Sequence, residues 1–257
     1  MAEQAGLIIA VDKPWGWTSF QVVNKLKWHL RHITGQKKIK IGHAGTLDPL
    51  ATGLLLVCAG NATKQIEQLQ TGIKVYSGTM VIGATTPCFD MEQAIDSYYP
   101  IDQINAQSLE KARQLFVGEI EQVPPSFSAV KVDGQRAYLS ARDGEQPNIT
   151  SKRVTIYDFT ISEPVESQPL SFIQQKENDR KRELYRNPQG FVPKGLLQMD
   201  FHITCSKGTY IRSIARDFGY ALNSGAFLSS LRRERIGDYT LENAIKIDEI
   251  EERIKTF

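Results

Sequence analysis

A chain of 257 residues with 41% hydrophobic and 23% charged residues has the length and composition of a globular protein with one large domain or two small ones. These values exclude a disordered or fibrous chain, and the longest apolar run, residues 54–59, is too short to span a bilayer. The net charge of +2 excludes no class of partner. Because the N-terminus lacks a basic flank and the three cysteines suggest no disulfide framework, we expect a soluble protein of the reducing cytoplasm.

The charges are unevenly placed near the N-terminus. Thr18 or Ser19 can cap a helix in which apolar residues recur at helical spacing, namely Phe20, Val23, Leu26 and Leu30. From residue 13 to 47 there is no Asp or Glu, while the basic residues there are Lys13, Lys25, Lys27, Arg31, Lys37, Lys38 and Lys40. An ordinary solvated helix surface would explain such a run, but a basic face also suits a polyanion, and we favour nucleic acid as its partner.

Strands and helices alternate along the rest of the chain. We expect strands at 54–58, 73–83, 152–162 and 197–205, and helices at 108–117 and 209–222. The segment 165–194 has prolines, mixed charge and little apolar periodicity, which predicts a mobile surface insertion. The pattern favours an α+β fold with a mixed or antiparallel central sheet flanked by helices. It also favours one domain, 1–239, with an insertion at about 165–195 and a short extension, 240–257.

The glycine-punctuated loop at 42–53 is the main candidate for a catalytic site. It carries Asp48 directly before Pro49, a residue that favours extended backbone at the position preceding it. An isolated Asp-Pro pair is most often only a turn. Here the same loop supplies His43 and Thr46, adjoins the basic helix and leads into an apolar strand, which is typical of a functional loop on a rigid scaffold.

These residues carry a resemblance to a known family. The stretch GHAGTLDPLATG at 42–53 resembles the catalytic motif of the TruB family of tRNA pseudouridine synthases. Further similarity is found at 13–19, 124–131 with Gly134, 137–138, 205–212 and 231–233, and a weaker match at 85–90. The similarity to the family covers about residues 7–239, apart from the insertion.

The resemblance implies a pseudouridine synthase fold and isomerisation of uridine to pseudouridine at position 55 in the T-loop of tRNA, without metal or cofactor. Asp48 would be the catalytic carboxylate. Attack on C1′ of the ribose, addition to C6 of the base and assisted elimination to a glycal all use an ionised carboxylate, and the sequence leaves the three routes open.

The resemblance also implies roles for residues outside the loop. Arg212 would orient Asp48, and Asp90 would hold the far side of the guanidinium. Tyr76 would stack on the flipped uracil and accept a proton through its hydroxyl. RNA contacts would comprise His43 as a wedge, Tyr210 and Leu231 as pocket walls, and Lys64, Lys131 and Lys207 on phosphates.

Two alternatives and one departure complete the expectations. A non-catalytic tRNA-folding chaperone could use the same basic surface, and a metal site at His29, His32, His43 and Asp48 has weak support.

Better-known family members continue into a C-terminal RNA-binding module, for which 18 residues after Tyr239 do not suffice. Basic residues of the insertion could then help to bind RNA, or the insertion could be inert; these are Lys176, Arg180, Lys181, Arg182 and Arg186. A monomer that binds the T-arm of tRNA, with no membrane association or obligate protein partner, is the expected state.

Overall fold

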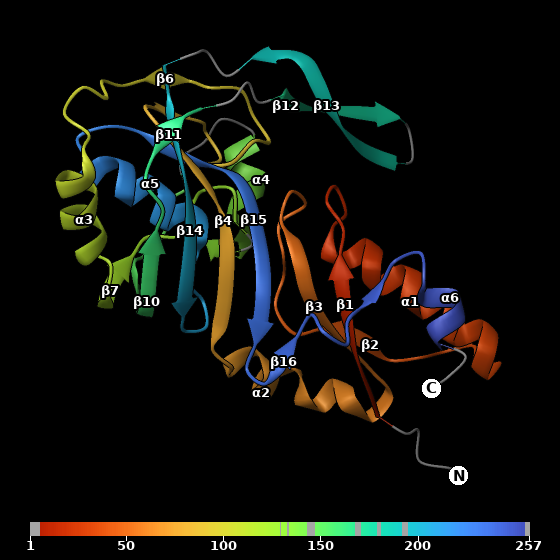
Figure 1. Ribbon diagram of the computed structural model, residues 1–257. Helices are drawn as coiled ribbons and strands as arrows, with labels where there is room; N and C mark the ends of the chain where they lie inside the picture. Colours follow the sequence, from red (N-terminus) through yellow and green to blue (C-terminus); the bar gives the residue numbers. More distant parts are fainter. Residues whose placement is uncertain are drawn as a thin grey trace. The chain divides into compact units, whose positions relative to one another are not determined.

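The computed structural model describes residues 6–128, 130–132, 134–142, 147–167, 171–178, 181–191 and 195–254. The chain forms two compact units, the first from residues 1–76 and 231–257 and the second from residues 77–230. The chain enters the second unit within strand β4 (Lys74–Ile82) and leaves it within strand β15 (Ala226–Ile236) (Figure 1).

The first unit contains strands of an 11-stranded mixed sheet, together with helices. Its strands are ordered β17–β1–β3–β15, with β2 paired to β3 and β16 to β15. The pairs β1–β17 and β3–β15 are parallel and the others are antiparallel. The elements are β1 (Leu7–Lys13), α1 (Ser19–Thr34), β2 (Ile41–His43), β3 (Thr52–Ala59), the 3₁₀ helix η1 (Gly60–Gln65), α2 (Ile66–Thr71), β16 (Tyr239–Thr240), β17 (Ile245–Lys246) and α6 (Ile250–Arg253).

Helix α1 begins where the sequence predicts. Thr18 caps it through a reciprocal pair of hydrogen bonds with Gln21. Its buried residues include Val22, Val23, Leu26 and Leu30, which join Ile9, Val11, Leu55 and Val57 in one core cluster. The placement of Phe20 in the apolar stripe is wrong, since its side chain is 68% exposed. Each helical residue turns by about 100°, so Phe20 points well away from the buried Ser19 beside it.

The second unit contains further strands of the same 11-stranded sheet and the remaining helices. The strand order is β4–β14–β10–β7, with β15 beside β4 and β11 paired to β14. The elements are β5 (Ala84–Thr85), β6 (Ser97–Tyr98), α3 (Ala106–Gln114), β7 (Gly118–Gln122), β8 (Lys131–Val132), β9 (Gln135–Arg136), α4 (Ala137–Arg142), β10 (Lys152–Ile161), β11 (Val165–Glu166), β12 (Ser171–Asn178), β13 (Lys181–Phe191), β14 (Leu197–Cys205) and α5 (Ile211–Ala221). The rings of Phe116, Phe159 and Phe218 pack together with centroids 5.8 to 6.3 Å apart.

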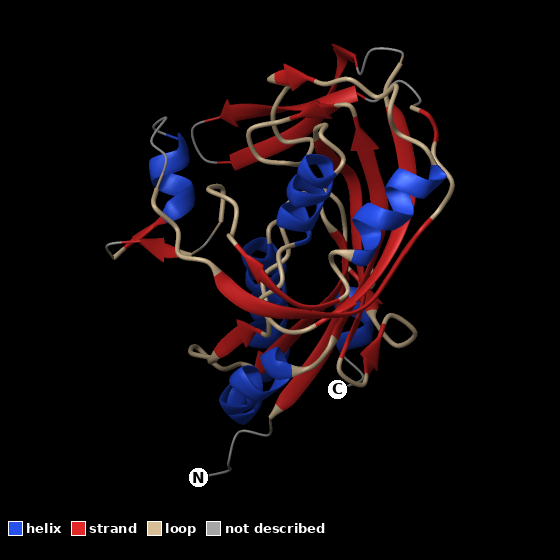
Figure 2. Cartoon of the chain, turned by 90° about the vertical axis from the view of Figure 1, so that its left-hand side faces the viewer, coloured by secondary structure: helices blue, strands red, loops and turns tan. Residues whose placement is uncertain are grey.

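Most predicted elements of the second unit are present. Strand β14 has the predicted bounds and buries Met199, Phe201, Ile203 and Cys205 in alternation. Helix α3 begins two residues earlier than predicted, because Asn105 provides its N-terminal cap and Ser108 forms the reciprocal bond. Helices and strands occur in both units, so the predicted α+β class and mixed sheet are confirmed (Figure 2). No helix in the described part of the chain is both long and apolar enough to cross a membrane.

The segment predicted to be a mobile surface insertion contains two paired strands in its described residues. Strands β12 and β13 pair antiparallel, from Ser171 opposite Phe191 to Asn178 opposite Lys181. The register shifts between Ser171 and Ile173, and Pro188 falls in the part of β13 opposite that shift, where a residue without an N–H group is tolerated. A polar hairpin is held by its backbone hydrogen bonds and shows no apolar alternation, which is why periodicity missed it. Arg180 lies outside the described residues.

Candidate active site

The loop that carries Asp48 connects two paired strands of the first unit. Strands β2 and β3 are antiparallel, with His43 opposite Val57, and Ala44 N–H donates to the carbonyl of Leu56 at 2.8 Å. Beyond this point the chain departs from the ladder, with Gly45 at φ 100°. Ala51 N–H donates to the carbonyl of Asp48 at 3.1 Å, which closes a turn around Pro49. The Asp48 side chain is half-buried at this turn.

Lys13 and Gly16 hold the residue that follows Asp48. Nζ of Lys13 donates to the carbonyls of Trp17, Pro14 and Pro49 at 2.6, 3.1 and 3.2 Å. Gly16 N–H also donates to the carbonyl of Pro49, at 2.9 Å. The Lys13 side chain is fully buried, so its ammonium group is satisfied by main-chain carbonyls in place of water.

Ser19 holds the residue that precedes Asp48. Its hydroxyl donates to the carbonyl of Leu47 at 3.1 Å and accepts the Leu47 N–H at 2.9 Å. Ser19 is the first residue of α1 and is buried, so the helix start predicted from the sequence fixes one side of the loop. Both main-chain groups of Leu47 are thereby paired.

Arg233 holds the beginning of the loop from strand β15. Its guanidinium donates from Nη2 to the carbonyl of Gly45 at 3.0 Å, from Nη1 to Thr46 at 3.4 Å, and from Nε to Leu54 at 2.8 Å. Only 1% of Arg233 is exposed. The planar fork of an arginine can serve several carbonyls at once, which a lysine cannot do in the same geometry.

Asp48 therefore lies on a loop whose main chain is held on both sides by buried groups. Lys13, Ser19 and Arg233 each bond to a residue within three positions of Asp48. Such support fixes a reactive side chain without a cost of reorganisation when the substrate arrives. A carboxylate in this setting can act as a nucleophile or stabilise a developing positive charge.

Burial, and after it neighbouring charges, shifts the pKa of two groups near the loop. Burial lowers the pKa of Lys13 to about 7; Asp48 opposes this, and Arg233 adds to it. Burial, and after it Arg233, lowers the pKa of His43, although a hydrogen bond with the Gly45 backbone opposes the shift. The buried Nδ1 of His43 has no hydrogen-bond partner among the described residues. An imidazole ring is well suited to stacking against a base.

Three other candidates belong to the first unit. Tyr76 is buried in β4 with 8% exposure. Lys64 is exposed in the last turn of η1, where an ammonium group can reach a phosphate. Leu231 is half-buried in β15, and its carbonyl accepts the Thr52 hydroxyl at 3.5 Å.

Arg212 and Asp90 lie together in the second unit. Arg212 is in the first turn of α5 and only 5% exposed, and its Nε is 3.7 Å from Oδ2 of Asp90. Its Nη1 and Nη2 donate to the carbonyls of Cys88 at 3.1 Å and Phe127 at 2.9 Å. Asp90 in turn accepts the Glu92 N–H at 2.9 Å. A buried guanidinium requires such partners, which fix its orientation.

Tyr210 directly precedes α5 and is held by a residue that the sequence did not single out. Gln122 is fully buried; its Oε1 accepts the Tyr210 N–H at 2.8 Å and its Nε2 donates to the Tyr210 carbonyl at 3.2 Å. Nζ of Lys152 lies 4.6 Å from the centre of the Tyr210 ring. Lys207 is exposed in the preceding turn, and Lys131 lies in β8, with its side chain outside the described part.

The weak metal-site alternative gains no support from these positions. Within the described ranges, no three His, Cys, Asp or Glu side chains form a group suited to a metal ion. Cys58 and Cys205 are 0% exposed, as expected of small core residues.

The residues that hold the Asp48 loop were missed as individual contributors. Lys13 and Ser19 fall in segment 13–19, and Arg233 falls in 231–233. Both segments supported the family resemblance, but nothing in their spacing indicated that they meet the loop. Gln122 had no signal, because a lone glutamine at the end of a strand is ordinarily a surface residue.

Comparison with known proteins bears directly on these segments. Residues 31–211 match the family model described as TruB family pseudouridylate synthase (N terminal domain). The tRNA pseudouridine synthase B of Flavobacterium johnsoniae is 47% identical over 97% of this chain and 96% of its own length. That of Phocaeicola vulgatus is 44% identical over 96% of this chain and 92% of its own.

Solved structures support the fold. A chain in the crystal structure of a Cbf5–Nop10–Gar1 complex matches 95% of this chain with a TM-score of 0.60 and 24% identity, and this chain spans about half, 53%, of that chain. A chain in the structure of an H/ACA RNP bound to a substrate RNA containing 2′-deoxyuridine matches with a TM-score of 0.57 and 22% identity. The predicted pseudouridine synthase fold is thus confirmed, and with the extended sequence identity above, the chain belongs to the TruB family of pseudouridylate synthases.

Proposed function

We propose that this protein isomerises uridine to pseudouridine in tRNA, at position 55 of the T-loop. Relatives at 47% and 44% identity are named tRNA pseudouridine synthase B. The observation that carries the proposal is the position of Asp48 on a loop held by Lys13, Ser19 and Arg233. A protein that only binds RNA has no need to fix one carboxylate in this way.

The reaction breaks the bond between N1 of uracil and C1′ of the ribose and forms a bond between C5 and C1′. The hydrogen on C5 leaves as a proton, and N1 gains one, so no oxidant, reductant or other co-reactant is required. The Asp48 carboxylate acts in its ionised form, either as a nucleophile at C1′ or C6 or as the group that assists elimination to a glycal.

The other candidate residues complete the proposal. Arg212, whose guanidinium is held by Asp90 and two carbonyls, orients Asp48 in the working enzyme. Tyr76 stacks on the flipped uracil and accepts a proton. His43 fills the space that the base leaves, because extruding a base from a folded loop costs a few kcal/mol. Tyr210 and Leu231 form walls for the base, and the exposed Lys64 and Lys207, together with Lys131, contact phosphates.

The experiment that tests the function is tritium release from unmodified tRNA transcript labelled at C5 of uridine. Wild-type protein is expected to release tritium and to leave pseudouridine at position 55 on mapping. Asp48→Asn should abolish release while tRNA binding persists, and exposed Asp238→Asn in the same unit serves as the matched control.

The outcomes separate an enzyme from a chaperone. Release by Asp48→Asn at the wild-type rate would disprove the role of Asp48. Lack of release by the wild-type protein, with accelerated tRNA refolding, would replace catalysis by the chaperone function. That the protein acts in the cytoplasm, as a monomer and without a cofactor remains a prediction. Measuring the mass of the protein in solution tests the monomer, and measuring turnover by a metal-free preparation tests the lack of a metal.

A further inference from the structure

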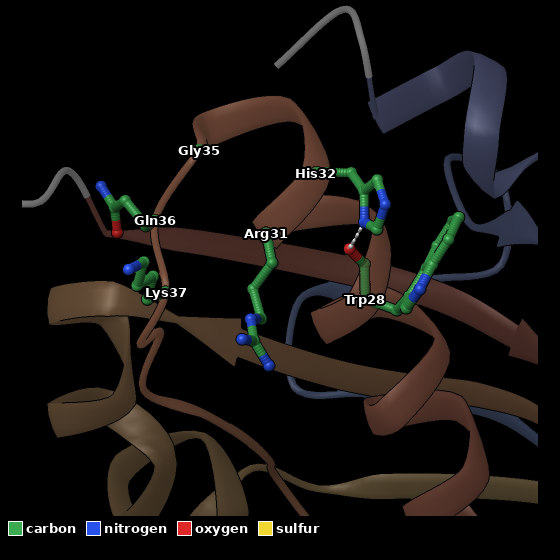
Figure 3. A pocket seen from close by; sticks show the side chains of 6 residues that line it. All are labelled: Trp28, Arg31, His32, Gly35, Gln36 and Lys37. Atoms are coloured by element: carbon green, nitrogen blue, oxygen red, sulfur yellow. Dashed lines mark hydrogen bonds between the residues drawn. The ribbon is translucent and has the colours of Figure 1, made fainter.

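A surface pocket of about 410 Å³ lies at the C-terminal end of helix α1 in the first unit. It is lined by Trp28, Arg31, His32, Gly35, Gln36 and Lys37. Figure 3 shows the rings of Trp28 and His32 together on one side, Gln36 and Lys37 on the other, and Arg31 between them. None of these residues belongs to the loop of Asp48 or to the groups that hold it. The volume is within the range of pockets that bind small ligands.

The aromatic side of the pocket is preformed. Trp28 is 56% exposed. The His32 ring lies 4.0 Å from the indole, centre to centre, with 34° between the planes, and its Nδ1 is 3.2 Å from the Trp28 carbonyl. The His29 ring is nearly perpendicular to the indole, with the two ring centres 4.7 Å apart. The indole is therefore oriented by its neighbours while more than half of it faces solvent.

The charged side of the pocket favours an anion. Arg31 and Lys37 are exposed, and none of the six lining residues is acidic. The exposed Lys38 and Lys40 lie one and three positions after Lys37. Arg31 in the last helical turn also complements the negative end of the helix dipole. That electrostatic role explains a cation at position 31, but it explains neither the exposed indole nor Lys37, which lies beyond the helix.

We infer that this pocket, the Trp28 pocket, binds an unpaired nucleotide of RNA, with the base stacked on Trp28 and the adjoining phosphates on Arg31 and Lys37. Single-stranded nucleic acid is recognised by this combination of an aromatic platform and a cationic groove, because every base has a stacking face and every linkage an anionic phosphate. The inference goes beyond the proposed isomerisation, since it concerns a second RNA contact made by residues with no part in the chemistry.

The test compares two RNA probes, a short uridine-rich oligoribonucleotide and an abasic chain of the same length, by direct binding at several salt concentrations. Trp28→Ala is expected to weaken binding of the oligoribonucleotide about tenfold, whereas Trp28→Phe retains most of the affinity. The affinity of the wild-type protein for the abasic chain should be about as low as the affinity of Trp28→Ala for the uridine-rich oligoribonucleotide. Arg31→Met and Lys37→Met should each reduce the slope of log K against log salt by about one.

Two variants control for general effects. Phe20→Ala removes a 68% exposed ring of the same helix that does not line the pocket, and Lys246→Met removes an exposed charge of the same unit. Neither should change the affinity. Because Trp28 is largely exposed, its variants should unfold at the wild-type temperature, which circular dichroism verifies. Equal weakening by Phe20→Ala, or an equal affinity of wild-type protein for both probes, would overturn the inference.

The readouts also separate this site from the catalytic one. Trp28→Ala should keep the wild-type turnover at saturating tRNA and raise the tRNA concentration needed to reach it. Asp48→Asn should lose turnover and keep the affinity for the oligoribonucleotide. Unchanged binding of both tRNA and oligoribonucleotide by Trp28→Ala would show that the pocket does not contact RNA, whatever the outcome for Asp48.

Discussion

Lys13 and Arg233 are paired with the same residue, Gly53, from the two strands that flank it. Lys13 is opposite Gly53 in the antiparallel β1–β3 pair, and Arg233 is opposite it in the parallel β15–β3 pair. Both side chains are almost fully buried and both donate to carbonyls of the loop that carries Asp48. Gly53 thus lies at the centre of a row of three residues that sets the conformation of the loop.

Replacement of Gly53 by alanine should strongly destabilise the protein. Gly53 has φ 98°, and a Cβ atom there would lie 2.3 Å from the carbonyl oxygen of Arg233, a backbone atom that cannot move aside. We expect a loss of about 3 kcal/mol or more in the free energy of unfolding, measured by urea denaturation. Gly118→Ala is the matched control, because Gly118 has φ 101° with no neighbour within 4 Å and should lose about 1 to 2 kcal/mol.

Arg233→Lys should impair turnover more than RNA binding. A lysine keeps the charge but cannot serve the carbonyls of Gly45, Thr46 and Leu54 together, so Asp48 loses its fixed position. Displacement of a reacting group by about 1 Å can cost roughly a hundredfold in rate. We expect kcat to fall about tenfold to a hundredfold with little change in KM. Exposed Arg235→Lys in the same strand is the control, and a loss confined to KM would contradict a positioning role.

Lys13 should make stability depend on pH in the alkaline range. Its pKa is about 7 in the folded protein, against 10.5 for a fully solvated lysine side chain, so the unfolded chain binds more protons between these values. The contribution of Lys13 to the free energy of unfolding therefore increases as the pH rises from about 7 to 10.5, by up to about 1.4 kcal/mol per pH unit. It is lost again when the pH is lowered to 7. Urea denaturation across this range should show the rise in the wild type and its loss in Lys13→Met. Parallel curves would mean that the folded and unfolded pKa values of Lys13 coincide.

Tyr76→Phe distinguishes proton transfer from stacking. The variant keeps the ring in a buried position of β4 and removes only the hydroxyl. If the hydroxyl accepts a proton, the single-turnover rate should fall by about a hundredfold or more while the affinity for tRNA is unchanged. Full turnover would remove the proton-transfer role and leave stacking. Tyr239→Phe, which changes a half-buried tyrosine of β16, controls for the loss of a hydroxyl.

The local structure around the site was predictable because it follows from neighbouring residues. The Thr18 cap, the apolar alternation of β14 and the glycine-punctuated loop at 42–53 each depend on a few consecutive side chains. The resemblance carried by those consecutive residues also identified the family. The β12–β13 hairpin escaped prediction, because its pairing is a property of the backbone and its strands alternate no apolar residues.

By itself, the sequence determined the class of fold, the family and Asp48 as the candidate carboxylate. Only the tertiary structure decided how the Asp48 loop is held, since Arg233 and Gly45 are separated by 188 positions in the chain. Their meeting depends on the parallel pairing of β3 with β15, which no local periodicity specifies. The physical reason is that side-chain patterns report which face of an element is buried, whereas a hydrogen bond between distant segments depends on which strands become neighbours.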